Sequence, residues 1–159
     1  MTVISRFGPV AGTLYIAFVF IQSLFFKFTG SVETTHIFGT LDAWASHAFG
    51  IEGLFLAPGP FNAYVIGSAE LVASVLLLMG LIAGGLWLRL AGSLLALGII
   101  SGAIVFHLFT PLGIVVLDDG GLLFAMAVGV WVTAAALAYS SASRLGLLTR
   151  RATLQAAAA

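Results

Sequence analysis

The chain has 159 residues, of which 61% are hydrophobic and only 8% are charged, and its mean hydropathy is +1.17. A soluble domain carries about 25% charged residues, so a surface this poor in charge is typical of a protein that lies in lipid. The formal net charge is zero, which excludes the basic surface of a nucleic-acid-binding protein, and the absence of cysteine excludes thiol–disulfide chemistry by this chain and any disulfide framework.

Four apolar segments are long enough to cross the hydrocarbon core of a bilayer, which needs about 20 residues of helix. They are predicted at residues 8–28, 61–83, 86–108 and 120–139. The first segment is predicted to be a retained helix, because it is longer than the apolar part of a signal peptide and Lys27-Phe28-Thr29-Gly30 follows it where a small-residue cleavage site would stand. The sequence therefore predicts an all-α integral membrane protein, a four-helix bundle in one domain of residues 1–140, with a tail over residues 141–159.

The connection between the first two spans has a helical pattern of its own over residues 34–49. One arc of this pattern is apolar and consists of Ile37, Phe38, Leu41, Trp44, Ala45, Ala48 and Phe49, and the opposite arc carries His36, Thr40, Ala43 and His47. The pattern predicts an amphipathic helix that lies flat in the membrane interface with Trp44 at headgroup depth, or a helix that packs on the outer end of the bundle. His36 and His47 are about 16 Å apart on such a helix, so one metal ion could not bind both, and no metal site is expected.

The other two connections are shorter and differ in character. Gly84-Gly85 predicts a tight turn, so the second and third spans should form an antiparallel pair. Residues 110–117 are too apolar for a solvated loop and are expected to pack on the bundle. The spacings Gly80-x-x-x-Gly84 and Gly98-x-x-x-Gly102 resemble close-packing motifs, and we expect them to mark helix packing inside the bundle.

The basic residues predict the orientation of the bundle. With four spans, five arginines fall on one side: Arg6, Arg89, Arg144, Arg150 and Arg151. Only Lys27 belongs to the other side. Because cytoplasmic connections carry an excess of Lys and Arg, both termini are predicted to be cytoplasmic.

One carboxylate lies inside a predicted span. At about 1.5 Å of rise per residue, Glu70 is roughly 13 Å below the outer boundary of its helix, where a charged side chain costs about 2.5–3.5 kcal/mol. It shares a helical stripe with Ala63, Gly67 and Ser74, whose small side chains allow a neighbouring helix to approach closely. Glu70 is therefore predicted to point into the bundle, either protonated or ionised against a cation.

Three further polar residues lie towards the same outer side of the bilayer. Lys27, with Ser23 one turn below it, is within reach of Glu70, although it could instead anchor its helix at the interface. His107 lies near the outer end of the third span, where it could serve a site or simply face the interface. Asp119 precedes the fourth span and could alternatively cap that helix. The sequence thus predicts one outward-side polar site built from these residues.

Three motifs occur together in this chain. They are Lys27-Phe28-Thr29-Gly30 with Glu33; Gly67-Ser68-Ala69-Glu70-Leu71; and Ile100-Ser101-Gly102-Ala103-Ile104 followed by His107-Leu108 and Asp119-Gly120-Gly121-Leu122-Leu123-Phe124. In this order the chain resembles the DoxX-like family of small four-helix bacterial membrane proteins, a family named for a subunit associated with quinol oxidation. The resemblance implies a location in the bacterial inner membrane. It also implies that the recurring polar positions, which are the expected binding residues, are Lys27, Glu33, Glu70, His107 and Asp119.

These features support three hypotheses of function. The first is a redox-linked site for a quinone or a similar amphiphile, in which Glu70 and His107, the candidate catalytic residues, transfer protons and Lys27 stabilises a developing anion. No haem-ligand pair, flavin fingerprint or cysteine-held cluster is present, so an electron-accepting partner would supply the redox cofactor and the chain is not expected to be a complete enzyme alone. The alternative is a non-catalytic accessory or assembly subunit of a larger membrane complex or homo-oligomer, and the third is a small-solute or proton pathway. A quinone or a lipid is the expected ligand, with no covalently bound cofactor.

Overall fold

The computed structural model describes residues 3–148, and this part of the chain consists of five α-helices without a β-strand. The helices are α1 (Val3–Thr29), α2 (Val32–Phe49), α3 (Ala63–Ile82), α4 (Leu86–Phe109) and α5 (Leu122–Arg144). All except α2 are long and apolar enough to cross a membrane. The predicted fold class, an all-helical membrane bundle with four spans, is confirmed, and the helix ends differ from the predicted ones by a few residues.

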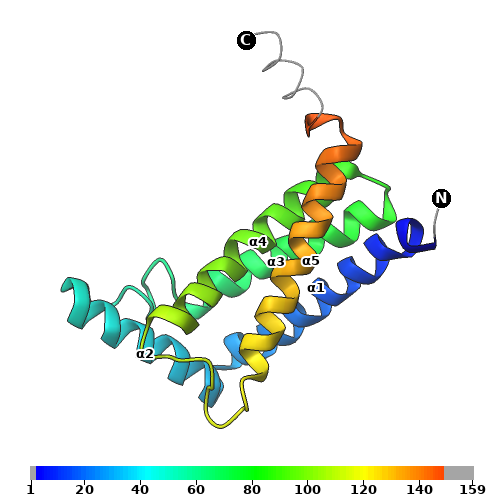
Figure 1. Ribbon diagram of the computed structural model, residues 1–159. Helices are drawn as coiled ribbons and strands as arrows, with labels where there is room; N and C mark the ends of the chain where they lie inside the picture. Colours follow the sequence, from blue (N-terminus) through cyan, green and yellow to red (C-terminus); the bar gives the residue numbers. More distant parts are fainter. Residues whose placement is uncertain (1–2, 149–159) are drawn as a thin grey trace, which may run out of the picture.

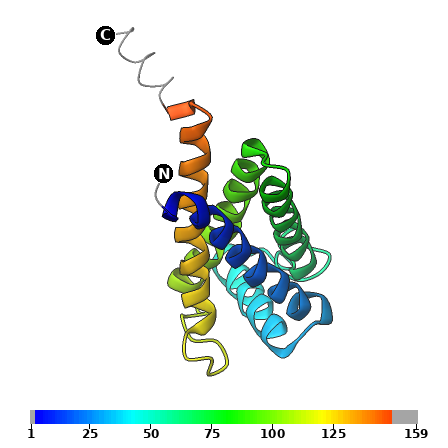
Figure 2. The same cartoon turned by 90° about the vertical axis from the view of Figure 1, so that its right-hand side faces the viewer.

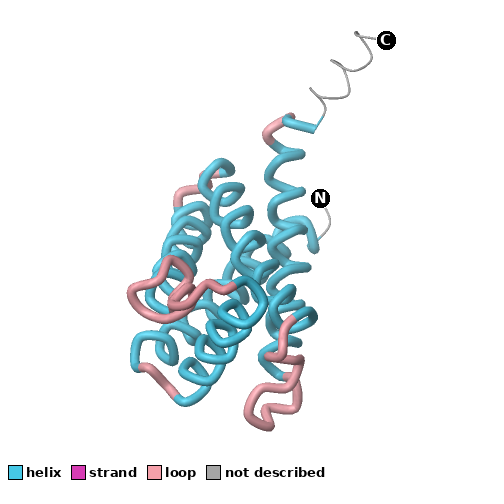
Figure 3. The backbone as a smooth tube through the Cα atoms, turned by 90° about the vertical axis from the view of Figure 1, so that its left-hand side faces the viewer, coloured by secondary structure: helices cyan, strands magenta, loops and turns pink. Residues whose placement is uncertain are grey.

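The four long helices form a closed bundle with α2 at one end. α1 packs on α3, α3 on α4, α4 on α5, and α5 on α1. The start of α1, the α3–α4 turn and the end of α5 lie at one end of the bundle, and α2 crosses the other end (Figure 1). The two long loops and the short link before α2 lie towards that second end, which we call the α2 end (Figure 3). The α2 end is therefore where the chain departs most from a plain bundle.

The start and the end of α2 are fixed by local hydrogen bonds. The side chain of Ser31 accepts a hydrogen bond from the N–H of Thr34 at 3.3 Å, and Gly50 ends the helix in a left-handed conformation with φ of 69°. Asp42 ties the helix to the following loop, because its two carboxylate oxygens accept hydrogen bonds from the N–H groups of Gly53 and Phe55. These contacts hold α2 in one place over the bundle.

The apolar face of α2 packs on protein. Its buried apolar residues belong to an apolar cluster at the α2 end, which comprises Phe38, Leu41, Ala45, Phe55, Leu112 and Val116. Of the two predicted positions for this helix, packing on the end of the bundle is the one that the structure shows. Leu112 and Val116 come from the apolar connection after α4, so the prediction that this connection packs on the bundle is also confirmed.

The opposite end is held together by a buried arginine. Arg89 lies in the first turn of α4 rather than in the connection, and its Nε donates a hydrogen bond of 2.9 Å to the hydroxyl of Ser141. The contact lies on the last part of α5, which was predicted to end at residue 139 and continues to Arg144. The hydroxyls of Ser140 and Ser141 donate back to the carbonyl oxygen of Leu137, so both polar side chains have a partner within the helix. The tail from residue 149 onwards, including the predicted orientation markers Arg150 and Arg151, lies outside the described residues.

The two glycine spacings have different roles. A Cβ atom on Gly80 would lie 2.7 Å from the backbone nitrogen of Arg89, so this glycine does mark close packing of α3 on α4. Gly84 instead forms the turn, with φ of +67°. A Cβ atom on Gly98 or Gly102 would meet nothing within 4 Å, so the prediction that this pair marks helix packing is wrong. The spacing alone could not distinguish glycines that a helix covers from glycines that border open space.

We expect Gly80→Ala to destabilise the protein by about 1–3 kcal/mol, because the new methyl group would collide with backbone that cannot move aside. Gly98→Ala should leave stability unchanged or raise it by about 0.5–1 kcal/mol, because alanine is the better helix former and has room. The measurement is chemical unfolding of the detergent-solubilised protein, followed by circular dichroism. Equal effects of the two substitutions would contradict this assignment.

Candidate functional site

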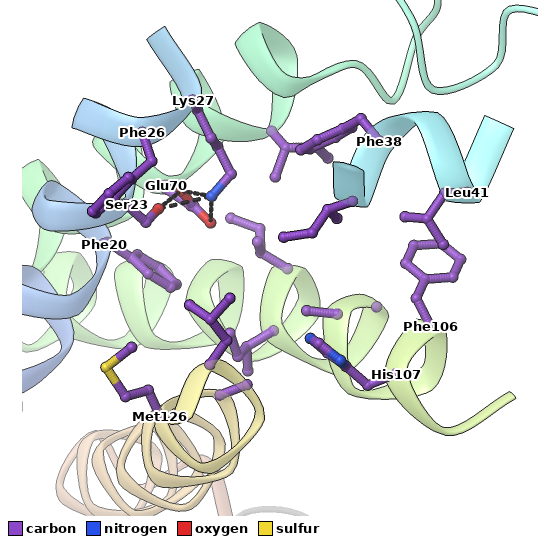
Figure 4. A pocket seen from close by; sticks show the side chains of 18 of the residues that line it. Phe20, Ser23, Phe26, Lys27, Phe38, Leu41, Glu70, Phe106, His107 and Met126 are labelled. Carbon is purple, nitrogen blue, oxygen red and sulfur yellow. Dashed lines mark hydrogen bonds and ion pairs between the residues drawn. The ribbon is translucent and has the colours of Figure 1, made fainter. Parts of the chain in front are cut away.

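The polar core of the bundle is an ion pair between α1 and α3. The Nζ of Lys27 donates hydrogen bonds to both carboxylate oxygens of Glu70, at 3.0 and 2.9 Å, and to the hydroxyl oxygen of Ser23 at 2.7 Å. The hydroxyl of Ser23 in turn donates to the Oε2 of Glu70 at 2.6 Å. The three side chains form a closed hydrogen-bonded set (Figure 4). Of the two states predicted for the carboxylate, this geometry is that of an ionised group paired with a cation.

The helix stripe that carries Glu70 explains how the pair forms. Gly67, Glu70 and Ser74 are buried on the face of α3 that meets the bundle, as predicted. A Cβ atom on Gly67 would lie 2.9 Å from the ring of Phe28, so the absent side chain brings α1 close enough for Lys27 to reach the carboxylate. Glu70 is only 5% exposed, and the charge is therefore compensated inside the protein rather than by water.

The ion pair borders a cavity of about 500 Å³ between the four long helices and α2. Apart from the ion-paired set, polar side chains line this cavity at Gln22 and His107. The rest of the wall is apolar, and it includes Gly98 and Gly102, so the two open glycines of α4 provide space in the cavity. A largely apolar cavity with a few polar groups in its wall is typical of a binding site for a small organic molecule.

His107 lies in the wall of the same cavity (Figure 4). Its Nδ1 is 2.6 Å from the carbonyl oxygen of Gly113, and because a carbonyl can only accept, Nδ1 carries the hydrogen. In the neutral ring the acceptor is then Nε2. The ring also makes an edge contact with Phe124, with centroids 5.6 Å apart. These two contacts fix the orientation of the imidazole, and its remaining nitrogen can accept a proton or a hydrogen bond from a ligand.

Asp119 supports the start of α5. Its Oδ1 accepts hydrogen bonds from the N–H groups of Val116 and Gly121, and its Oδ2 accepts one from the N–H of Leu123, each at 2.9 Å. The bond from Leu123, the other two backbone bonds and the charge of His107 hold the pKa of Asp119 below its usual value, against the opposing effect of desolvation. These contacts are those of a helix cap, which was the alternative prediction for Asp119.

Glu33 also lies at a helix start. It is in the first turn of α2, and hydrogen bonds from its own backbone N–H and from the Ser31 side chain lower the pKa of its carboxyl group. The predicted set of polar residues thus divides in two. Lys27, Glu70 and His107 border one cavity, whereas Glu33 and Asp119 serve the starts of α2 and α5.

We expect Asp119→Ala to lower the free energy of unfolding by about 1–2 kcal/mol at neutral pH, because three N–H groups lose their acceptor. The folded-state pKa is below the unfolded value, so this stabilisation is present above the unfolded value of about 3.9 and is lost as pH falls through the folded value. Wild type and variant should therefore converge in strongly acidic solution. Thermal melts of the detergent-solubilised protein between neutral and acidic pH measure this. Asp118→Asn is the neighbouring control, because Asn tolerates the left-handed backbone of that position, with φ of 60°. A constant difference between wild type and Asp119→Ala at all pH values would contradict the prediction.

Two residues of the cavity were not among the predicted site residues. Ser23 was noted only as a neighbour of Lys27, yet it bonds to both members of the ion pair. Gln22 carries an amide within a membrane span. The rarity of polar side chains in such spans, which singled out Glu70, would have identified it too. His36 and His47 are exposed on α2. Within residues 3–148 no three His, Asp or Glu side chains lie close enough together to hold a metal ion.

Comparison of the chain with family models, with curated proteins and with solved structures gave no match. The resemblance to the DoxX-like family therefore stays a prediction from the sequence motifs. What can be said of function comes from the cavity and its polar wall.

Proposed function

We propose that this membrane protein binds a quinone or a similar amphiphile in the cavity beside Lys27 and Glu70. The observation that carries the proposal is the cavity itself, about 500 Å³ of mostly apolar space with an ion pair and an oriented histidine in its wall. The apolar wall suits a ring and the start of a hydrocarbon tail. The polar groups suit the oxygen atoms of a quinone or quinol head.

The proposed chemistry is proton transfer at membrane depth. A quinol that is oxidised to a quinone releases two protons and two electrons. The carboxylate of Glu70 and the Nε2 of His107 are the groups that would take the protons. When Glu70 becomes protonated, Lys27 loses its counter-charge and its ammonium group becomes available to stabilise an anionic ligand oxygen. The electrons would pass to a separate electron-accepting protein that carries its own redox cofactor.

The proposal includes an orientation. Arg89 and Arg144 lie at the end of the bundle opposite α2, and Lys27 lies towards the α2 end. By the positive-inside rule the arginine end faces the cytoplasm, and both termini with it. With the DoxX-like resemblance, we propose the bacterial inner membrane as the location, so that the cavity lies in the outer half of that membrane.

The test is binding of decylubiquinone to the purified protein in nanodiscs, followed by quenching of the tryptophan fluorescence. We expect Glu70→Gln to weaken binding at least tenfold, because the amide cannot take a proton and no longer pairs with Lys27. Glu52→Gln, at an exposed acid in the loop after α2, is the matched control and should bind as wild type. Normal affinity in Glu70→Gln, with the variant still folded by circular dichroism, would refute the proposal.

A further inference from the structure

Buried apolar side chains border the cavity towards both ends of the bundle. Towards α2 it is covered by the apolar cluster described above, in which Phe38, Leu41 and Phe55 are at most 8% exposed. Towards the arginine end lies the main core of the bundle, which includes the fully buried Leu77 and Val130. Most of the wall at these two ends therefore consists of packed apolar side chains, and Phe61, in the loop before α3, is a wall residue at the α2 end that is also exposed.

Three of the four seams between neighbouring helices are held by specific contacts. The α1–α3 seam is closed by the ion pair and by Gly67 against Phe28. The α4–α5 seam is closed by the hydrogen bond from the indole of Trp131 to the hydroxyl of Ser101, at 3.0 Å, and by the bond from Arg89 to Ser141. In the α3–α4 seam, Gly80 and Gly92 bring the two backbones together in the half near the arginine end.

The α1–α5 seam is different, because the contacts from α1 come from the half of that helix near the arginine end, whereas on α5 they reach Met126, one turn after that helix begins at the α2 end. A Cβ atom on Gly12 would lie 2.9 Å from Thr133, and the hydroxyl of Tyr15 donates to the carbonyl oxygen of Met126 at 3.4 Å. Further towards α2 the helices separate, and Figure 2 shows α1 crossing α5 and then running away from it. The two backbones thus diverge on the α2 side of this crossing.

The residues at this opening are both exposed and part of the cavity wall. The face of α1 that carries Gly12 and Tyr15 continues, two turns later, as Gln22 and Phe26. Both line the cavity, Phe26 is 42% exposed, and Gln22 is exposed too. From α5, the half-buried Leu123 and Met126 line the same side. Residues that face the cavity and the lipid at once mark its mouth.

Gln22 adds a chemical argument. Its amide lies in a membrane span, and its side chain makes no hydrogen bond within residues 3–148. An amide without a hydrogen-bond partner costs free energy in hydrocarbon. Gln22 therefore suits a point that the polar head of a ligand passes. Gly98 of α4 and Phe61 of the loop before α3 are exposed wall residues as well, but neither has a polar side chain.

We infer that the cavity opens sideways into the membrane leaflet on the α2 side, between α1 and α5, with Gln22 at its mouth. Its ligand is then a lipid-resident amphiphile, whose head reaches Lys27 and Glu70 while its hydrocarbon tail stays between the two helices. The nature of the head rests on the proposed function, whereas the sideways opening rests on the packing alone. A ligand dissolved in water would have no comparable route.

The test uses a single cysteine at Ala103, a half-buried residue in the cavity wall, because the natural chain has no cysteine. A bimane label at this position is quenched in vesicles either by phosphatidylcholine with a nitroxide on its acyl chain or by iodide in the water. We expect strong quenching by the lipid and little by iodide. Gln22→Phe should reduce the lipid quenching at least twofold, and Ile21→Phe, at a lipid-exposed position beside it, should not.

Quenching by iodide would show that the cavity opens to water and would overturn the inference, as would a label that neither quencher reaches. Lipid quenching that survives Gln22→Phe but is abolished by Gly98→Phe would place the mouth beside Gly98 of α4 and would also overturn it. The experiment contains no quinone. If the lipid quenching behaves as expected but decylubiquinone does not bind, the proposed function fails and the sideways opening stands.

Discussion

Lys27→Met is expected to lower the free energy of unfolding by about 3–5 kcal/mol, because it leaves the carboxylate of Glu70 buried without its cation. Ser23 would remain as a hydrogen-bond donor, but a neutral hydroxyl does not balance the charge. The measurement is unfolding in mixed micelles with increasing dodecyl sulfate, followed by circular dichroism. The effect should be among the largest of any single substitution in this chain.

The matched partner variant is the double substitution Lys27→Met with Glu70→Leu. Because two apolar side chains of similar size remove both charges, we expect it to regain most of the stability that Lys27→Met loses. The double variant should nevertheless fail to bind decylubiquinone, which would separate the structural role of the pair from its role in the site. A double variant as unstable as Lys27→Met would show that the loss does not come from the uncompensated carboxylate.

Gly102→Leu is expected to abolish decylubiquinone binding, with a loss of at least tenfold in affinity, while the protein stays folded. The new side chain has room on its own helix, because a Cβ atom there meets nothing within 4 Å, and it would occupy part of the cavity that the glycine now leaves open. Leucine is also the better helix former by about 0.5–1 kcal/mol, so stability should not fall. Loss of binding without loss of stability is what filling a binding site produces.

Gly39→Leu is the control for this substitution. Gly39 is also a helical glycine on which a Cβ atom would meet nothing within 4 Å, but it lies on α2 and not in the cavity wall. The variant should bind decylubiquinone as wild type does. If both leucine variants bind equally well, the space beside Gly102 is not where the ligand lies.

Much of the fold could be predicted because the bilayer imposes simple rules. Helix length and apolar composition located the four spans, and the rarity of carboxylates in lipid singled out Glu70. The small-residue stripe through Gly67 correctly predicted that the side chain of Glu70 points into the bundle, because close helix approach requires small residues. These inferences depend on properties that a single helix already has.

The features that could not be predicted depend on how the helices are placed relative to one another. Asp119 was grouped with the polar site because it is acidic and lies on the same side, and only the loop geometry shows that its oxygens face the backbone N–H groups of α5. Gly98 and Gly102 have the spacing of a packing motif, but no helix covers them. The cavity is a gap between five helices, and no pattern within one of them could reveal it.

The ion pair between α1 and α3 has a consequence for how the chain enters the membrane. Alone in lipid, a helix with a carboxylate near its centre costs about 2.5–3.5 kcal/mol at that residue. The chain is made from its N-terminus, so α1, with Lys27, reaches the bilayer before α3 does. Lys27 is therefore already in the bilayer when α3 inserts, and Glu70 can pair with it at once. This order of the helices along the chain lowers the free-energy cost of inserting α3.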